Sequence, residues 1–84
     1  MAWYVYMLRC GDGSLYTGST TDVERRLREH QEGTGARYTR SRPPVTLAYA
    51  EEAPDRSAAQ RREAAIKKLP RVQKLKLIGK GERT

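Results

Sequence analysis

This chain of 84 residues lacks phenylalanine and asparagine altogether, and it has one tryptophan, one cysteine and one histidine. A lone cysteine, Cys10, excludes an internal disulfide and is typical of a reducing compartment, so we expect a cytoplasmic protein. No apolar run approaches the length of a membrane span. The apolar patch at 2–8 also lacks the basic leader of a secretory signal, so we expect no membrane partner.

The chain has an excess of positive charge. Seventeen Lys and Arg against ten Asp and Glu leave a net charge of +7. Arg outnumbers Lys, and the planar fork of Arg pairs well with phosphate oxygens. Nucleic acid is therefore the leading partner, with simple solubility as the bland alternative. A chain of this length forms one domain with a thin core, which we place at 1–79 with a short tail at 80–84.

Local patterns predict two strands and a helix in the first third of the chain. Residues 3–9 and 14–19 flank "GDG", whose glycines suit a hairpin turn. The segment "STTDVERRLREHQEG" predicts an amphipathic helix capped by Thr21 or Asp22 and ended by Gly33. The following "GTGARYTRSRPP" predicts a basic loop, because it is rich in Gly, Arg and Pro.

The remaining residues predict one strand and two helices. "VTLAYAEE" alternates as a third strand does. A helix capped by Asp55 or Ser57 runs to Leu69, and Pro70 suits the first turn of a second, short helix. We therefore expect an α+β fold, with a small three-stranded antiparallel sheet flanked by helices in the order β-β-α-β-α-α.

Three of the five tyrosines lie in the predicted hairpin. Tyr4 and Tyr6 project to one face of their strand, and Tyr16 lies across the hairpin from them. Spacing alone leaves two interpretations open: a functional cluster of hydroxyl groups, or an aromatic packing cluster with solvated tips.

These segments resemble the GIY-YIG nuclease family. "YVY" (4–6) and "YTG" (16–18) match its two signature tripeptides, with Tyr4 in place of the first glycine. "GSTTDVERRLREH" is similar to the family's segment with the essential arginine, and "REAAIKKL" to its later helix with a metal-binding glutamate. The resemblance covers nearly the whole chain and is greatest to the short, stand-alone bacterial branch.

The resemblance implies a catalytic set of Tyr6, Tyr16, Arg26 and Glu63. The tyrosines would position or deprotonate water, Arg26 would bind phosphate, and Glu63 would hold one divalent ion, Mg²⁺ or Mn²⁺. Helical spacing agrees with this set, because Arg26 and Glu63 border the apolar stripes of their helices. Tyr4, Gly18 and His30 are accessory candidates, although a lone histidine at a helix end is commonly a cap or a surface residue.

Basic and aromatic residues around the first helix and the loop are candidate nucleic-acid contacts. Tyr38 has the alternative role of anchoring the loop to the core. Arg62 falls among apolar positions of its helix, where it either snorkels, forms an ion pair, or shows that the helix is rotated. The contact candidates are Arg25, Arg37, Tyr38, Arg40 and Arg42.

The resemblance thus predicts a metal-dependent endonuclease that hydrolyses phosphodiester bonds with weak sequence preference. We expect DNA rather than RNA as substrate, a role in DNA repair or nucleic-acid turnover, and a monomer or weak dimer. Many family members use an asparagine near the C-terminal end of the core to organise the active site, so either another group takes its place here or activity is weakened or lost. The alternative is a non-catalytic nucleic-acid binding module, and a protein-interaction scaffold is a weaker third.

Overall fold

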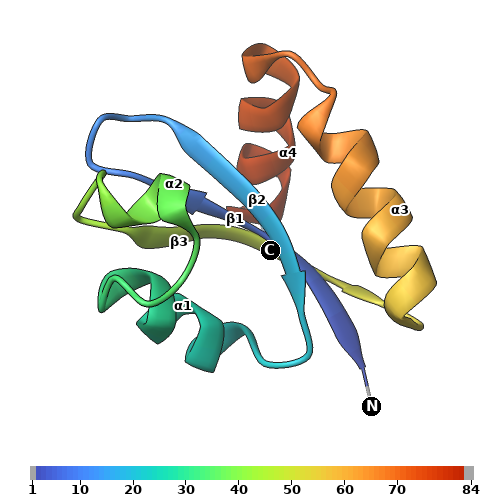
Figure 1. Cartoon of the computed structure of the whole chain (residues 1–84). Coiled ribbons are helices and arrows are strands. Elements are labelled where there is room, and N and C mark those ends of the chain that lie inside the picture. The colour runs from blue at the N-terminus through green and yellow to red at the C-terminus, as the bar shows by residue number, and fades with distance from the viewer. Residues whose placement is uncertain (1, 83–84) are drawn as a thin grey trace.

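The sheet grows from the predicted hairpin (Figure 1). The computed structural model describes residues 2–82, with side chains to residue 80. β1 (Trp3–Arg9) and β2 (Leu15–Thr20) pair antiparallel, and Gly13 in their turn has φ +84°. β3 (Thr46–Ala53) pairs antiparallel with the other side of β1, so the strand order is β2-β1-β3. The predicted α+β class and three-stranded antiparallel sheet are confirmed, and β2 is an edge strand.

Carboxylates cap two of the helices at their N-termini. The Asp22 side chain accepts from the Arg25 amide at 3.0 Å and begins α1 (Val23–Gln31). Asp55 accepts from the Ala58 amide at 2.8 Å and begins α3 (Arg56–Lys67). α4 (Arg71–Glu82) follows Pro70 and continues beyond residue 79, where we placed the end of the domain. Residues 83–84 of the predicted tail lie outside the described residues.

The predicted basic loop contains a short helix, so the expectation of continuous loop between α1 and β3 is wrong. α2 (Arg37–Arg40) begins after Ala36 without a side-chain cap. A tertiary contact stabilises this helix, because Thr39 is buried and lies against His30 of α1. A side-chain contact with another element stabilises this single turn where local propensity alone does not.

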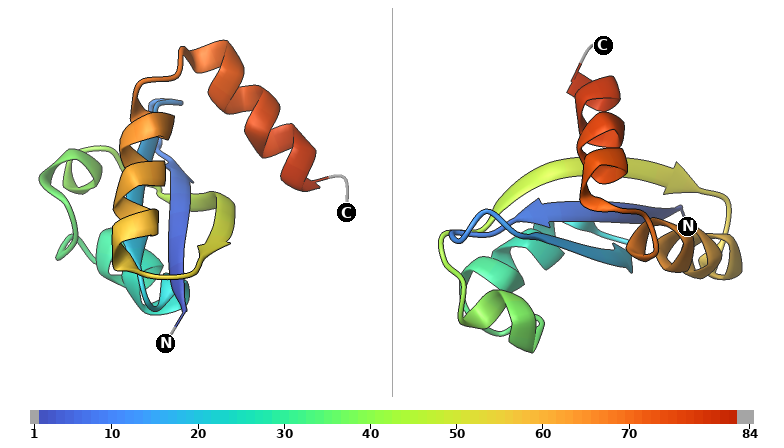
Figure 2. Two further views of the ribbon diagram at one scale, coloured as in Figure 1. Left: turned by 90° about the vertical axis from the view of Figure 1, so that its right-hand side faces the viewer. Right: turned by 90° about the horizontal axis from the view of Figure 1, so that it is seen from above.

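Helices cover both faces of the sheet, and the core divides accordingly (Figure 2). Val5 and Met7 pack with Ala59, Ile66 and Ile78 under α3 and α4. The opposite face carries a smaller cluster in which Leu27 of α1 packs on three buried residues, Tyr6, Leu8 and Val45. β1, α1 and α3 therefore bury the apolar positions that their residue spacing predicts.

Arg62 is held by an ion pair. Its Nε donates to both carboxylate oxygens of Glu51 on β3, at 3.0 and 3.2 Å. Of the alternatives that the helix spacing left open, the structure shows this one.

No helix within residues 2–82 is long and apolar enough to cross a bilayer.

Candidate active site

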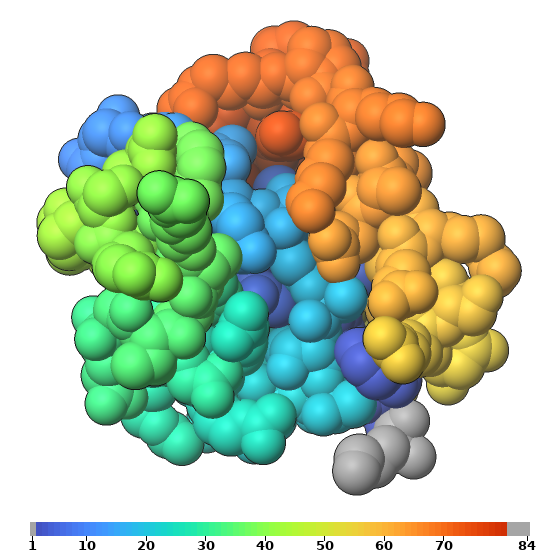
Figure 3. Space-filling view, viewed as in Figure 1, coloured from blue at the N-terminus to red at the C-terminus, as the bar shows by residue number. Residues whose placement is uncertain are grey.

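β2 is one of the two edge strands of the sheet, and helices lie on both sides of it. α1 and α2 lie on the face that carries Tyr6, whereas α3 packs on the opposite face and also contacts β2. Figure 3 shows β2 between these two walls, with the surface hollowed beside the strand. Side chains from the two faces of the sheet can approach each other here, because no further strand separates them.

Tyr6 projects from β1 toward α1, on the face of the sheet that α1 and α2 cover. Its side chain is 2% exposed, and its hydroxyl lies 3.0 Å from Nε2 of His30. Gly18 lies directly opposite Tyr6 in the β1–β2 register. A Cβ at residue 18 would come within 2.5 Å of the Tyr6 hydroxyl, so only glycine leaves room for this group.

His30 is buried, with 1% of its surface exposed, so the expectation of a cap or surface histidine is wrong. Its Nδ1 lies 2.7 Å from Oγ1 of Thr39, and that hydroxyl donates to the Ala36 carbonyl at 2.9 Å. These two contacts favour a proton on Nδ1, which leaves Nε2 to accept from Tyr6. The Ala36 amide approaches Nδ1 at 3.3 Å, a longer contact that suits the opposite tautomer. We favour the first tautomer because its contacts are shorter.

Electrostatic interactions join Tyr6 to the other predicted site residues. Burial raises the pKa of Tyr6 to about 12, while nearby Arg26 lowers it in part and Tyr16 and Glu63 raise it. Arg26, Tyr16 and Glu63 thus each lie close enough to Tyr6 to influence its pKa. Burial also lowers the pKa of His30, and the charge of Arg26 adds to this shift, so the site favours the neutral ring.

Aromatic rings link this cluster to the surface of α2. The Tyr16 ring lies 5.1 Å from that of His30 and 5.9 Å from that of Tyr38, centroid to centroid. The Arg42 guanidinium covers the Tyr38 ring at 3.9 Å and donates to Asp12 at 3.1 Å. Tyr38 therefore anchors α2, which is one of its two predicted roles. The Tyr38 residue is still 38% exposed to solvent.

The second wall contributes Glu63 from α3. Ser19 of β2 donates to its Oε1 at 2.7 Å, and Nζ of Lys67 lies 2.7 Å from its Oε2. The bond to Glu63 raises the pKa of Lys67, and the nearby Tyr16 hydroxyl adds to the rise. Glu63 and Lys67 therefore lie at the same edge as the tyrosines, although they belong to the opposite face of the sheet.

A hard divalent cation suits the donor set at Glu63. Its carboxylate is 22% exposed and faces the edge, and oxygen is the ligand atom that Mg²⁺ and Mn²⁺ prefer. Residues 2–82 contain no cluster of three or more His, Cys, Asp or Glu side chains that could hold a metal. An ion here would take one carboxylate from the protein and its remaining ligands from water or phosphate, a pattern common for Mg²⁺. The exposed Lys67 would have to move aside.

Some predicted residues lie away from this cluster. Tyr4 borders a separate pocket with Val23 and Leu47 at the start of α1. Three predicted nucleic-acid contacts are exposed on the helices of the first wall, and no hydrogen bond of their side chains occurs within residues 2–80: Arg25, Arg37 and Arg40.

Sequence reasoning missed three residues of the site, namely Ser19, Thr39 and Lys67. Only Lys67 carried a local signal, because it follows Glu63 at the helical spacing of i,i+4. Thr39 of α2 bonds to His30 of α1, and Ser19 of β2 bonds to Glu63 of α3. Neither contact leaves a pattern in neighbouring residues.

Comparison with known proteins agrees with this arrangement. A family model described as the GIY-YIG catalytic domain matches residues 2–76. A UPF0213 protein of Streptococcus sanguinis is 60% identical over 75 residues, which cover 89% of this chain and 86% of that protein. A second, from Xanthomonas axonopodis pv. citri, is 49% identical over 98% of this chain and 80% of its own length.

A solved structure shares the fold as well as the sequence. The solution NMR structure of a UPF0213 protein from Bacillus halodurans superposes with a TM-score of 0.63 at 46% identity, covering 99% of this chain and 89% of that one. Both tyrosine tripeptides, the arginine helix and the glutamate helix fall within the range that the family model matches. The chain belongs to the GIY-YIG domain family.

Proposed function

We propose that this protein is a metal-dependent endonuclease that hydrolyses phosphodiester bonds at the β2 edge, with DNA favoured over RNA. The family suggests a nuclease. The observation that carries the proposal is the buried Tyr6–His30 contact of 3.0 Å, which lies within electrostatic reach of Arg26, Tyr16 and Glu63. A phosphate bound at this edge would come under the charges of these groups, while the Tyr6–His30 pair itself stays buried.

Proton transfer starts from the Tyr6–His30 pair. At its raised pKa the Tyr6 hydroxyl keeps its proton at neutral pH, so Tyr6 can accept a proton from water only as it passes its own to a neighbouring acceptor. The neutral His30 ring offers Nε2 for that role, since Thr39 engages the other ring nitrogen. The Tyr6 oxygen can hold the attacking water, and it would take the water's proton as its own proton passes to Nε2 of His30.

Charge stabilisation comes from the cations of the two walls. Arg26 donates one Nη1 hydrogen bond to Glu29 at 3.1 Å, which holds the guanidinium beside Tyr6. Its other N–H groups suit a phosphate oxygen. Glu63 would hold a divalent ion, and such an ion, when bound, stabilises negative charge on the phosphate. Lys67, once displaced, is a further cation for the same phosphate.

A panel of labelled duplex, nicked, flap and single-stranded DNA and RNA tests the proposal with Mg²⁺ and with Mn²⁺. We expect wild type to cut at least one substrate, DNA before RNA, and both Glu63→Gln and Arg26→Gln to cut none. Glu52→Gln, a matched change of an exposed glutamate on β3, should cut as wild type does. Undiminished cutting by Glu63→Gln would refute the assignment.

A non-catalytic nucleic-acid binding module is the second candidate. The ion pair of Glu63 with Lys67 favours it, as does the lack of asparagine in the chain. This candidate predicts that every substrate is bound and none is cut under either metal. If the protein is the proposed endonuclease, its role lies in DNA repair or in nucleic-acid turnover. The substrate that it cuts best would distinguish these two roles.

A further inference from the structure

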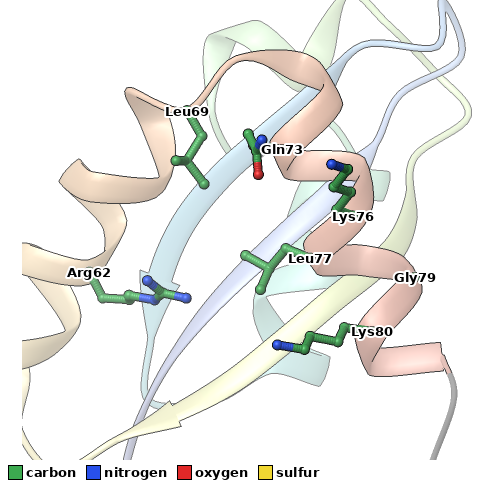
Figure 4. A pocket seen from close by; sticks show the side chains of 7 residues that line it. All are labelled: Arg62, Leu69, Gln73, Lys76, Leu77, Gly79 and Lys80. Carbon is green, nitrogen blue, oxygen red and sulfur yellow. The ribbon is translucent and has the colours of Figure 1, made fainter.

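A second basic hollow lies between α3 and α4, away from the residues of the β2 edge. Its volume is about 590 Å³, within the about 300–1,000 Å³ of small-molecule sites. Figure 4 shows side chains from both helices directed into it. Its cations are Arg62 from α3 with Lys76 and Lys80 from α4.

The Arg62 guanidinium is oriented but only partly used. Its Nε donates to Glu51, and the same carboxylate accepts from the Tyr49 hydroxyl at 2.8 Å. The terminal nitrogens of Arg62 make no hydrogen bond within the part of the chain that the structure describes. Glu51 therefore fixes a fork whose remaining donors face the hollow (Figure 4).

The two lysines of α4 bring uncompensated charge to the same place. Lys76 and Lys80 lie one turn apart on the side of α4 that lines the hollow. Among the side chains of residues 2–80, neither forms an ion pair. Like charges at this spacing repel, and an anion bound between them and Arg62 would relieve that repulsion.

The rest of the lining is not what a bare anion requires. Leu69 and Leu77 form apolar walls, and the Gln73 amide can both donate and accept hydrogen bonds. Gly79 also lines the hollow, and a Cβ there would meet nothing within 4 Å, so the space is open at this point. The hollow thus combines three cationic side chains with two leucines and one amide side chain.

We infer that this hollow, the α3–α4 groove, binds a nucleotide unit, either free or as part of a strand. The three cations suit the phosphate, the two leucines suit the face of a base, and Gln73 suits its edge. An acidic peptide would satisfy the cations and leave the apolar walls without a partner. The inference concerns binding and does not depend on whether the β2 edge cuts nucleic acid.

Amide chemical shifts of the full-length protein, titrated in EDTA so that no cutting occurs, test the inference. The probes are thymidine 5′-monophosphate, a single strand of about twelve nucleotides, and tetraglutamate, all at about 0.15 M salt. We expect thymidine monophosphate or the strand, but not tetraglutamate, to shift α3 and α4 amides saturably. Binding of the monophosphate indicates a free nucleotide, and binding of the strand alone indicates a nucleotide within a chain.

Two pairs of variants separate a built site from general charge. Lys76→Gln/Lys80→Gln should weaken binding about tenfold, whereas Lys68→Gln/Lys74→Gln, with the same loss of charge outside the lining, should weaken it less than about twofold. Gly79→Leu should block the groove without changing charge, and Gly79→Ala should not. Equal losses in both lysine pairs, equal shifts by tetraglutamate, or shifts confined to the β2 edge would each overturn the inference. The cleavage assay is independent, so either proposal can fail alone.

Discussion

The hydroxyl of Tyr6 and Nε2 of His30 lie 3.0 Å apart in the interior, and both residues are almost completely buried. A buried polar pair of this kind keeps its contact only if each partner is satisfied. Thr39 satisfies the other ring nitrogen, and Gly18 and Gly35 leave space for the hydroxyl and the ring. The pair is therefore a constructed feature of the fold, and it can be tested by substitution.

Tyr6→Phe should keep the fold and lose most activity. The substitution removes a proton donor, so we expect cleavage to fall by about 10²–10⁴-fold. Loss of the hydrogen bond should cost about 1 kcal/mol of unfolding free energy. Cleavage kinetics and urea denaturation measure the two effects. Tyr4→Phe, on the same face of β1 but outside the cluster, is the matched control and should cut normally; equal losses in both variants would contradict the role of Tyr6.

Gly18→Ala should displace Tyr6. The added methyl group would lie 2.5 Å from the hydroxyl, so we expect a loss of about 1–3 kcal/mol in unfolding free energy together with a loss of cleavage. Gly79→Ala is the contrasting substitution, because nothing lies within 4 Å of its new Cβ. Within α4 it should stabilise by about 1 kcal/mol. Thermal melts of the two variants should therefore shift in opposite directions.

Lys67→Met should expose Glu63 to metal ions. An exposed i,i+4 ion pair is worth at most about 1 kcal/mol, so we expect Mn²⁺ affinity without substrate to rise by up to about fivefold. Titration calorimetry measures this affinity independently of cutting. Lys68→Met, the neighbouring change with no partner at Glu63, should leave it unaltered. An affinity that falls in Lys67→Met would show that the ammonium group does not compete with the metal.

The stability of the protein should fall in mild acid because of His30. Its pKa is lowered by burial, so the folded state prefers the neutral ring, and the unfolded chain takes up a proton first as the pH falls below about 6.5. Unfolding free energy should be full above that pH and decrease below it. His30 is the only histidine, so its ring signals in NMR are assigned at once. A ring that titrates at or above 6.5 would contradict its burial, and its ¹⁵N shifts report the tautomer.

The basic residues in α2 and just after it should divide into a binding group and a structural group. Arg37→Gln and Arg40→Gln should each reduce the log–log salt dependence of DNA affinity by about 0.9, the value for one phosphate contact. Arg42→Gln is matched in charge, but Arg42 already bonds to Asp12 and covers Tyr38. We expect it to lower thermal stability and to change the slope less. Identical slopes for all three variants would remove the distinction.

Local sequence patterns predicted most of the backbone. The "GDG" turn, the caps Asp22 and Asp55, and Pro70 mark element boundaries through interactions within a few residues. Such signals can be found in one sequence, because the turn or cap and its partner are neighbours in the chain. The same holds for the stripes that α1 and α3 bury.

Contacts between elements could not be predicted in this way. The burial of His30 depends on β1, α2 and the glycine at residue 35 together, and α2 itself depends on Thr39 meeting that ring. The partner of Arg62 is Glu51, which lies on a different element. Residue spacing gives the direction of a side chain along its own helix or strand, but it does not give what the neighbouring element presents there.

The residues of the proposed site lie far apart in the sequence, so they are synthesised at different times. Tyr6, Tyr16 and Arg26 are translated first, Glu63 comes much later, and Ile78, the residue of α4 that is buried in the core, comes later still. A ribosome that has released the hairpin and α1 therefore holds a nascent chain without the carboxylate of the site. The proposed hydrolytic site would therefore be complete only once α3 has been synthesised and has packed against the sheet.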